Sequence, residues 1–274
     1  MITSPIIDIG ANLTHPDLFQ KIPQIIDLMK ENNVVASIII SSSLLDYKKA
    51  IKITEKYPNM FFNTVGFHPH NAKEYHSSDY LTIKSLASHS NVVAIGECGL
   101  DYYRLYSPKE MQIECFERQI QISIETNKPL FLHERESHKD FFNILSSHCK
   151  NLSKFVVHCF TGEKDQLKKY LNLGAYIGIT GWITDRDRGA HLPELLKYIP
   201  QEKLMIETDC PYLIPHNLEK NVNNTNYPHY LPYIASFISK CLNINEDILR
   251  QRTYKNTLEF FNINEQTEQI TPIT

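Results

Sequence analysis

The chain has 274 residues, of which 42% are hydrophobic and 11% aromatic, so it can bury a substantial core and is not a disordered protein. Its net charge of −3 argues against the broadly basic surface of proteins that coat duplex DNA, so a nucleic-acid substrate would need a small local patch. The apolar runs are too short to span a bilayer and the first residues lack a signal-peptide pattern, which predicts a cytoplasmic protein without membrane contact.

Strand-like apolar runs alternate with helical patterns along the whole chain. Eight strands are predicted, at residues 6–10, 34–41, 61–65, 92–97, 130–133, 155–158, 175–180 and 204–207. Helical spacing is found at residues 18–31, 43–56, 81–89, 108–126, 139–147, 164–173, 192–198 and 229–261. Such alternation is typical of parallel βαβ units, and eight units in a chain of this length predict a single-domain (β/α)8 TIM-type barrel of the α/β class.

Two segments stand outside this alternation. Residues 211–228 are rich in Asn and Pro without any period, which indicates a long functional loop. Residues 262–274 are polar and predict a frayed C-terminal tail, so the barrel domain is expected to span residues 1–261.

Four of the predicted strands end at, or just before, a residue that can bind a metal. These residues are Glu97, His133, His158 and Asp209, each preceded by an apolar run. Because the carboxyl ends of all strands open onto one face of a parallel barrel, the four side chains are expected to meet there. Two neutral imidazoles and two carboxylates neutralise a divalent cation and leave positions open for water. The cation would lower the pKa of that water, and Asp209 is the natural acceptor of its proton.

The sequence around these residues resembles the signature blocks of the TatD-type deoxyribonucleases, a family of amidohydrolase-like barrels. The blocks are GFHPH at residues 66–70, GECGLD at 96–101, PLFLHER at 129–135, VHCFTG at 157–162 and ETDCPY at 207–212. They occur in the family's order, and the likeness extends from residue 8 to residue 261. The resemblance implies a metal-dependent exonuclease that removes nucleotides from the 3′ end of DNA. It also implies that Glu97, His133 and His158 are metal ligands and that Asp209 is a ligand or general base.

The first strand departs from the family pattern. Most members begin with Asp-x-His-x-His, whereas here Asp8 is followed by Gly10 and Asn12 at the histidine positions. The TatD branch of the family resembles this variant. We therefore expect one firm metal site, with any second metal held weakly through Glu97, Asn12 and water.

Two histidines follow the third predicted strand and bracket Pro69. One interpretation is a rigid structural turn. The other is that at least one of them faces the phosphate or the leaving group as a donor. The family resemblance favours a catalytic role for His68, and His70 is expected to bind the substrate.

Further candidates for substrate binding lie beyond other strands. Arg135 follows His133 by two residues, and its guanidinium is suited to a bidentate phosphate contact, with a surface ion pair as the alternative. Stacking on unpaired bases is predicted for Trp182, and also for Tyr102 and Tyr103, with simple packing as the alternative. Glu207 is predicted to orient a metal ligand rather than to bind the metal.

These features predict a metal-dependent 3′–5′ exonuclease acting on single-stranded or frayed DNA, or on RNA. An amidohydrolase or an aminoacyl-tRNA deacylase is the alternative, because the same metal and base serve carbonyl substrates equally well. Barrel hydrolases of that kind often carry a carboxylated lysine where Glu97 stands, which favours the nuclease. A non-enzymatic binding protein is a third hypothesis, motivated by the missing histidine pair.

The donor set and the family resemblance favour different metals. Two imidazoles suit manganese or zinc, whereas the resemblance implies magnesium, which prefers oxygen ligands. We expect magnesium or manganese, with zinc as the alternative. A monomer is the favoured state.

Overall fold

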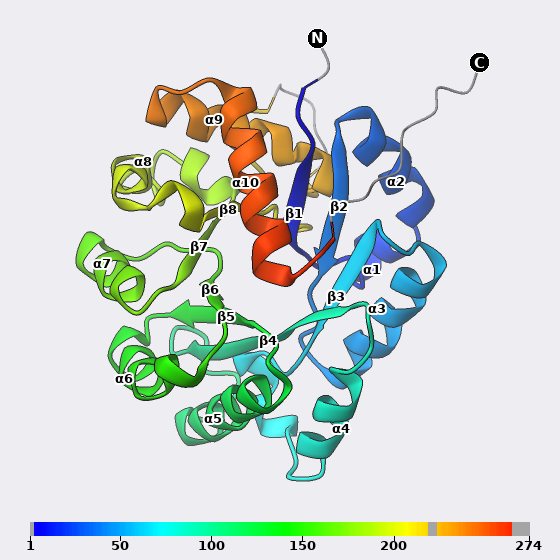
Figure 1. Cartoon of the computed structure of the whole chain (residues 1–274), viewed down its shortest axis with the longest axis vertical. Coiled ribbons are helices and arrows are strands. Elements are labelled where there is room, and N and C mark those ends of the chain that lie inside the picture. Colours follow the sequence, from blue (N-terminus) through cyan, green and yellow to red (C-terminus); the bar gives the residue numbers. More distant parts are fainter. Residues whose placement is uncertain (1–2, 219–223, 265–274) are drawn as a thin grey trace.

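The computed structural model describes residues 3–218 and 224–264 and contains eight parallel strands in the order β1 to β8. The strands are β1 Ile6–Ala11, β2 Val34–Ile39, β3 Phe61–Val65, β4 Val92–Asp101, β5 Leu130–Arg135, β6 Phe155–Val157, β7 Tyr176–Ile179 and β8 Leu204–Ile206. Ala11 forms a parallel bridge with Cys210, which joins the first strand to the segment after the last one in a nearly closed barrel (Figure 1). The predicted (β/α)8 TIM-type barrel is confirmed.

Helices connect the strands and surround the barrel. They are α1 Pro16–Phe19, α2 Ile22–Glu31, α3 Leu44–Lys56, α4 Asp79–Leu86, α5 Lys109–Thr126, α6 His138–His148, α7 Lys164–Asn172, α8 Leu192–Leu195, α9 Leu231–Leu242 and α10 Glu246–Phe261. The single helix predicted at residues 18–31 is two helices, because a proline in the first turn of α2 cannot continue the preceding one. The pattern at residues 229–261 divides at Asn243, whose left-handed backbone (φ 52°) ends α9.

β4 is four residues longer than the sequence predicted, and the expected end at residue 97 was wrong. A register shift between Gly96 and Cys98 leaves Glu97 without a partner in β5, after which pairing resumes up to Asp101 and Arg135. Such a bulge re-aims one side chain without ending the strand. The consequence is that Asp101 belongs to the strand rather than to a loop.

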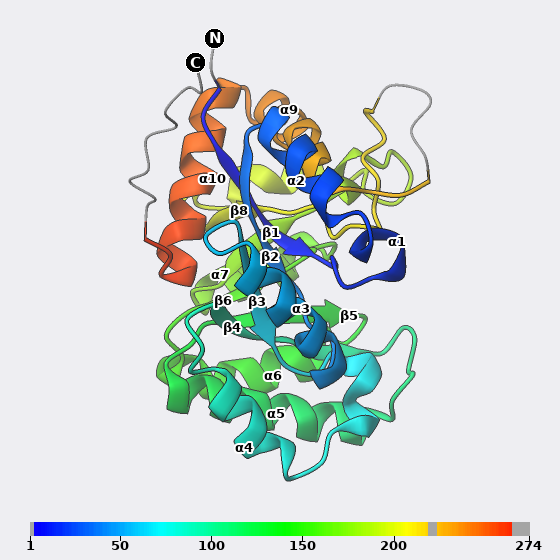
Figure 2. The ribbon, with the colours of Figure 1, turned by 90° about the vertical axis from the view of Figure 1, so that its right-hand side faces the viewer.

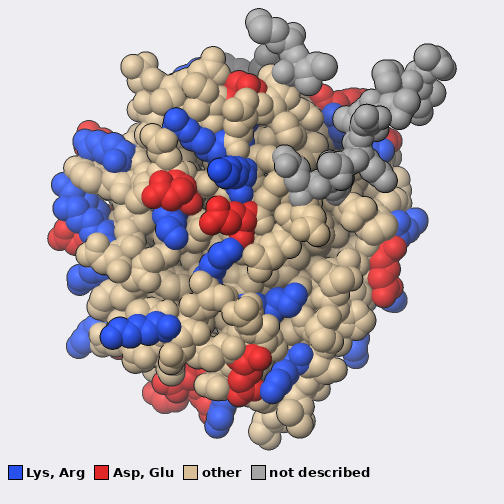
Figure 3. Space-filling model, viewed as in Figure 1, with Lys and Arg blue, Asp and Glu red and all other residues tan. Residues whose placement is uncertain are grey.

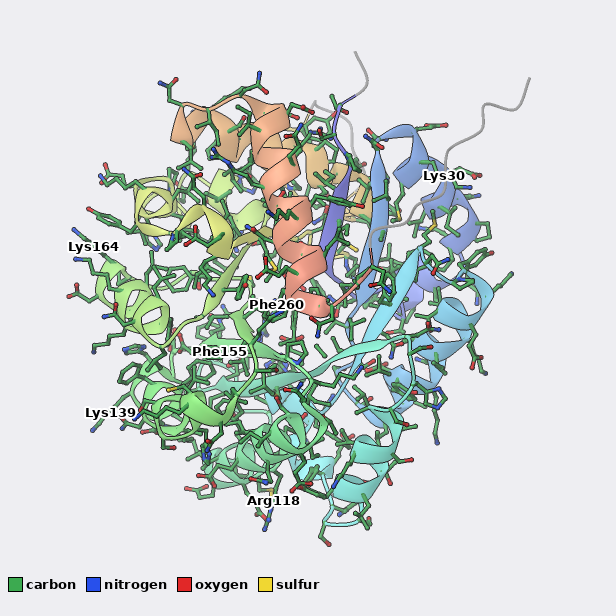
Figure 4. The ribbon with its side chains drawn as sticks, in the orientation of Figure 1. Lys30, Arg118, Lys139, Phe155, Lys164 and Phe260 are labelled. Carbon is green, nitrogen blue, oxygen red and sulfur yellow. The ribbon has the colours of Figure 1, made fainter. Side chains whose placement is uncertain are left out.

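Alternate residues of the strands fill the interior of the barrel. This inner cluster is apolar and comprises Ile9, Ile38, Ile40, Val93, Ala94, Phe131, Val156, Tyr176, Met205, Phe260 and Phe261. The last two residues end α10 and close the amino-terminal end of the barrel, where the Phe260 ring lies 4.9 Å from that of Tyr176. Figure 4 shows Phe260 at the middle of the ring of strands, whereas Lys139 and Lys164 lie on the outer helices.

The carboxyl ends of the strands open on the side away from α10. In Figure 2, α10 lies on the left and the arrowheads of β1 and β5 point to the right. A functional site at the carboxyl ends is therefore on the face opposite the plug formed by Phe260 and Phe261.

Parts of the two irregular segments fall outside the described residues. They are residues 219–223 of the predicted loop at 211–228 and residues 265–274 of the predicted tail at 262–274. Within the described part of that tail, Ile263 packs against the inner cluster. Among the described residues, no helix is long and apolar enough to cross a membrane.

The plug formed by Phe260 and Phe261 should contribute to the stability of the barrel. Phe260→Ala is expected to lower the free energy of unfolding by about 3–5 kcal/mol, because it leaves a cavity among side chains that are fully buried. Denaturant unfolding of both proteins measures the difference. Leu81→Ala is the control, since that side chain is 70% exposed and its loss should change the free energy by less than about 0.5 kcal/mol. Equal losses for the two variants would contradict a structural role for the plug.

Candidate metal centre

The alternation of the strands directs three polar side chains to one point above the apolar interior. His133, His158 and Glu207 each follow an inner-cluster residue by two positions, namely Phe131, Val156 and Met205. Side chains two residues apart on a strand lie on the same face. The three residues therefore form the next layer of the barrel toward its carboxyl end.

Glu97 joins this layer from the bulge in β4. Its Oε1 lies 2.7 Å from Nε2 of His158, 2.9 Å from Nδ1 of His133 and 3.3 Å from Nε2 of His68. Single ligand atoms of His68, Glu97 and His133 all lie within 4.8 Å of one another, which is a spacing that can hold a metal ion. Three imidazoles and one carboxylate thus converge on one point.

The second nitrogens of two of these rings face carboxylates. Nε2 of His133 lies 3.2 Å from Oδ2 of Asp101, and Nδ1 of His158 lies 3.3 Å from Oε2 of Glu207. A carboxylate at one ring nitrogen keeps the proton there and leaves the lone pair of the other nitrogen for a cation. Nδ1 of His133 and Nε2 of His158 are therefore the nitrogens available to a metal.

The nitrogen of His68 that faces the centre carries a proton and has no free lone pair for a metal. The backbone N–H of His70 donates to its Nδ1 at 3.0 Å, and burial lowers the pKa of His68 to about 4. A neutral imidazole whose Nδ1 accepts a hydrogen bond carries its proton on Nε2. His68 thus directs an N–H donor at the centre, next to Glu97.

The electrostatics of this layer favour positive charge at its centre. Burial opposes the charged form of His158, but the Glu97 and Glu207 carboxylates outweigh it and raise the pKa of His158 well above its usual value. Burial likewise opposes ionisation of Glu97, yet His158, His68 and His133 hold its pKa well below the usual range. Surroundings that stabilise a proton on an imidazole also stabilise a divalent cation, which releases that proton on binding. The residues present therefore fit a divalent cation.

Asp209 reaches the same mouth from the segment after β8. Its backbone N–H donates to the carbonyl of Gly10 at 2.8 Å, and its φ of 53° turns the chain at the strand end. Asn12 donates from Nδ2 to Oδ1 of Asp209 at 3.0 Å. Burial raises the pKa of Asp209 to about 7, with the charges of Glu97 and Glu207 adding to the rise. A carboxylate with such a pKa can accept a proton near neutral pH.

Two glycines make room for Glu207 inside the barrel. A Cβ added to Gly10 in β1 would lie 2.4 Å from Glu207 Oε2, and one added to Gly178 in β7 would lie 2.6 Å from Oε1. The carboxylate also accepts a hydrogen bond from the backbone N–H of Cys159. In this structure, a side chain at position 10 would compete with Glu207 for the same space.

Two buried carboxylates were missing from the residues expected at the site. Asp101 was assigned no role because β4 was expected to end earlier, although it lies within the GECGLD block. Burial alone would raise its pKa, but hydrogen bonds from His133 and His70 hold the pKa of Asp101 well below the usual range. Asp8 accepts hydrogen bonds from the backbone and hydroxyl of Thr208 across the β1–β8 seam, and burial raises its pKa to about 8.

The predicted substrate-binding residues lie at or after the carboxyl ends of three strands, β3, β5 and β7. His70 Nε2 lies 2.8 Å from Asp101 Oδ2. The guanidinium of Arg135 lies 4.1 Å from the ring centroid of Tyr103. Trp182 lies in the 3-10 turn Gly181–Thr184 after β7, and its buried indole nitrogen has no hydrogen-bond partner among the described residues.

Comparison with known proteins identifies relatives over nearly the whole chain. A family model described as TatD related DNase matches residues 7–262. The chain is 37% identical over 258 residues to the 3′-5′ ssDNA/RNA exonuclease TatD of Edwardsiella piscicida, covering 94% of this chain and 99% of that protein. It is 38% identical to the protein of the same name from Escherichia fergusonii, covering 93% of this chain and 98% of that protein.

A solved structure agrees with this result. The hydrolase TatD family protein from Entamoeba histolytica superposes with a TM-score of 0.86 at 30% identity, covering 95% of this chain and 99% of that one. The match of fold, motifs and length confirms the resemblance drawn from the sequence blocks. The chain therefore belongs to the TatD related DNase family.

Proposed function

We propose that this chain is a metal-dependent 3′–5′ exonuclease that hydrolyses phosphodiester bonds of single-stranded DNA or RNA. The observation that carries the proposal is the convergence of His133 Nδ1 and His158 Nε2 on one oxygen of Glu97 at the carboxyl ends of the strands. The printed names of the relatives supply the substrate class and the direction of degradation.

In this proposal Glu97, His133 and His158 bind one divalent cation, and Asp209 completes the set. Asp101 and Glu207 hold the two histidine rings in the orientation that metal binding needs. A cation bound there supplies a water molecule of lowered pKa and neutralises charge on the phosphate. Magnesium or manganese is the proposed ion and zinc the alternative, since imidazole ligands also suit zinc.

The remaining steps belong to residues of the chain itself. Asp209, positioned by Asn12, accepts the proton of the attacking water. His68 Nε2–H donates to a phosphate oxygen, where negative charge grows during the reaction. His70, Arg135 and Trp182 are proposed to bind the substrate around this centre.

Three further assignments complete the proposal. The six cysteines are free thiols, which suits a reducing compartment and supports a cytoplasmic location. The catalytic unit is inferred to span residues 1–261, close to the family match at 7–262. A monomer is the proposed state.

The proposed reaction should depend on a bound divalent cation. Single strands labelled at the 3′ or the 5′ end, incubated with the protein and magnesium or manganese, should lose nucleotides stepwise from the 3′ end. EDTA should stop the release, and added cation should restore it, because the proposed water is activated only by a bound cation. Electrophoresis of the labelled strands measures the products. No release with magnesium, manganese or zinc, together with hydrolysis of an ester or amide substrate, would favour the amidohydrolase alternative.

The proposed metal ligands can be tested by substitution. Glu97→Gln and His158→Ala should each lower kcat/KM for nucleotide release by more than about 100-fold, because each removes a ligand or its charge. Circular dichroism and thermal unfolding should show that both variants remain folded. His89→Ala is the control, since this histidine is exposed and lies before β4 at the amino-terminal end. Near-normal rates in both ligand variants would mean that the site lies elsewhere.

A further inference from the structure

Exposed aromatic side chains are confined to the face that carries the metal centre. Among the described Tyr, Phe and Trp residues, three are exposed: Tyr103 (54%), Tyr106 (55%) and Tyr212 (53%). Tyr103 and Tyr106 follow β4, and Tyr212 follows β8, so all three lie at the carboxyl ends of strands. Exposed Leu105 lies between the first two and enlarges this patch. Large exposed apolar side chains gathered in one place indicate a binding surface.

The loop that carries Tyr103 and Tyr106 is anchored at both ends. Oδ1 of Asp101 accepts the backbone N–H of Arg104 at 2.8 Å. The Ser107 hydroxyl donates to the carbonyl of His70, and Gln112 donates to the carbonyl of Ser107, both at 2.8 Å. The two tyrosine rings thus project from a loop whose backbone is held in place, which lowers the entropy lost when they bind a ligand.

Each of the two rings has an arginine beside it. The guanidinium of Arg135 lies 4.1 Å from the ring centroid of Tyr103. That of Arg104 lies 5.9 Å from the ring of Tyr106 and donates to its hydroxyl at 3.1 Å. Flat rings next to guanidinium groups match the two parts of a nucleotide, namely a base to stack on and a phosphate to pair with.

Direct contacts join this loop to the metal centre. The ring of Tyr106 lies 4.8 Å from that of His70, and His70 contacts the Asp101 carboxylate, which also contacts His133. A nucleotide on Tyr106 would therefore lie next to the nucleotide whose phosphate reaches the centre.

Tyr212 lies on another part of the same mouth. Its backbone N–H donates to the carbonyl of Asp209 at 3.0 Å. Its ring lies 5.8 Å from that of His15, which follows β1. Tyr212 is thus held beside Asp209, at the carboxyl ends of β8 and β1.

We propose that Tyr103, Tyr106 and Tyr212 form a stacking surface for unpaired bases, with Arg104 and Arg135 binding the adjacent phosphates. This inference rests on the proposed exonuclease function and names the feature that selects single strands. Both faces of a base are occupied inside a duplex, so only an unpaired base can stack on a tyrosine. Stacking also needs no broadly basic surface. The net charge of the chain is only −3. Figure 3 shows the opposite face, which carries α10, and basic and acidic side chains are intermixed there.

Binding without turnover tests the surface. A 5′-fluorescent single strand is titrated with the protein in EDTA, and fluorescence anisotropy measures the dissociation constant. Tyr106→Ala should weaken binding by about 5- to 100-fold, the range for loss of one stacked base. Tyr106→Phe, which keeps the ring, should bind like the wild type. In manganese, the KM of Tyr106→Ala should rise by a similar factor with kcat nearly unchanged.

Two controls separate stacking from general attraction. A strand of the same length with abasic nucleotides at its 3′ end should bind the wild type weakly. Tyr106→Ala should bind this abasic strand with the same affinity as the wild type. Tyr57→Ala is the matched control and should bind the intact strand normally. The ring of Tyr57 also has a cation beside it, since Lys56 Nζ lies 5.2 Å from the ring centroid. Tyr57, however, follows α3 and precedes β3, at the amino-terminal end of the barrel.

Two outcomes would overturn the inference. One is that affinity and KM are the same for Tyr106→Ala as for the wild type. The other is that the variant loses as much affinity for the abasic strand as for the intact one. If the wild type releases nucleotides in either case, the proposed exonuclease function stands and only the stacking surface is refuted. A wild type that neither binds the strand nor releases nucleotides would instead refute the proposed function.

Discussion

The arrangement of the site depends on one carboxylate, that of Glu97, which three imidazoles approach from β3, β5 and β6 or from the segments after them. Its position follows from the register shift in β4, which leaves the residue without a partner in β5 and directs its side chain toward the barrel mouth. His133 and His158 approach it with one nitrogen each, while Asp101 and Glu207 engage the other nitrogen of each ring. A carboxylate on the far side of each ring fixes the tautomer, and that selects the atom available to a metal.

His68 shows how a hydrogen bond can separate roles within one cluster. Judged by distance alone, His68 could bind a metal together with Glu97 and His133. The backbone N–H of His70 occupies its Nδ1, so the nitrogen that faces the centre carries a proton. The same local contact that shapes the turn after β3 thus makes His68 suited to donate to a phosphate rather than to bind the cation.

Because position 10 is glycine rather than histidine, the barrel interior has room there for another side chain. Gly10 and Gly178 leave the space that the Glu207 carboxylate fills, and Glu207 in turn contacts His158. Asn12 retains a polar role by donating to Asp209. The variant first strand is therefore compatible with the proposed metal site. The exposed tyrosines on the neighbouring loops add a feature suited to unpaired bases, which fits a chain of slightly negative net charge.

Much of this protein could be predicted from the chain alone. Apolar runs of strand length, each followed by a helical pattern, are enough to predict the eight-stranded barrel. The strands of a parallel barrel are buried on both faces, so their sequences must be apolar throughout. The order of Glu97, His133, His158 and Asp209 at the strand ends predicts where they meet. The bulge at Glu97 and the role of Asp101 could not be predicted, because they depend on pairing between strands distant in sequence. The sequence did predict that Glu207 orients a metal ligand, but not that this ligand is His158. The proton position on His68 and the clustering of exposed tyrosines also emerged only from the folded chain, since local pattern does not encode contacts and exposure.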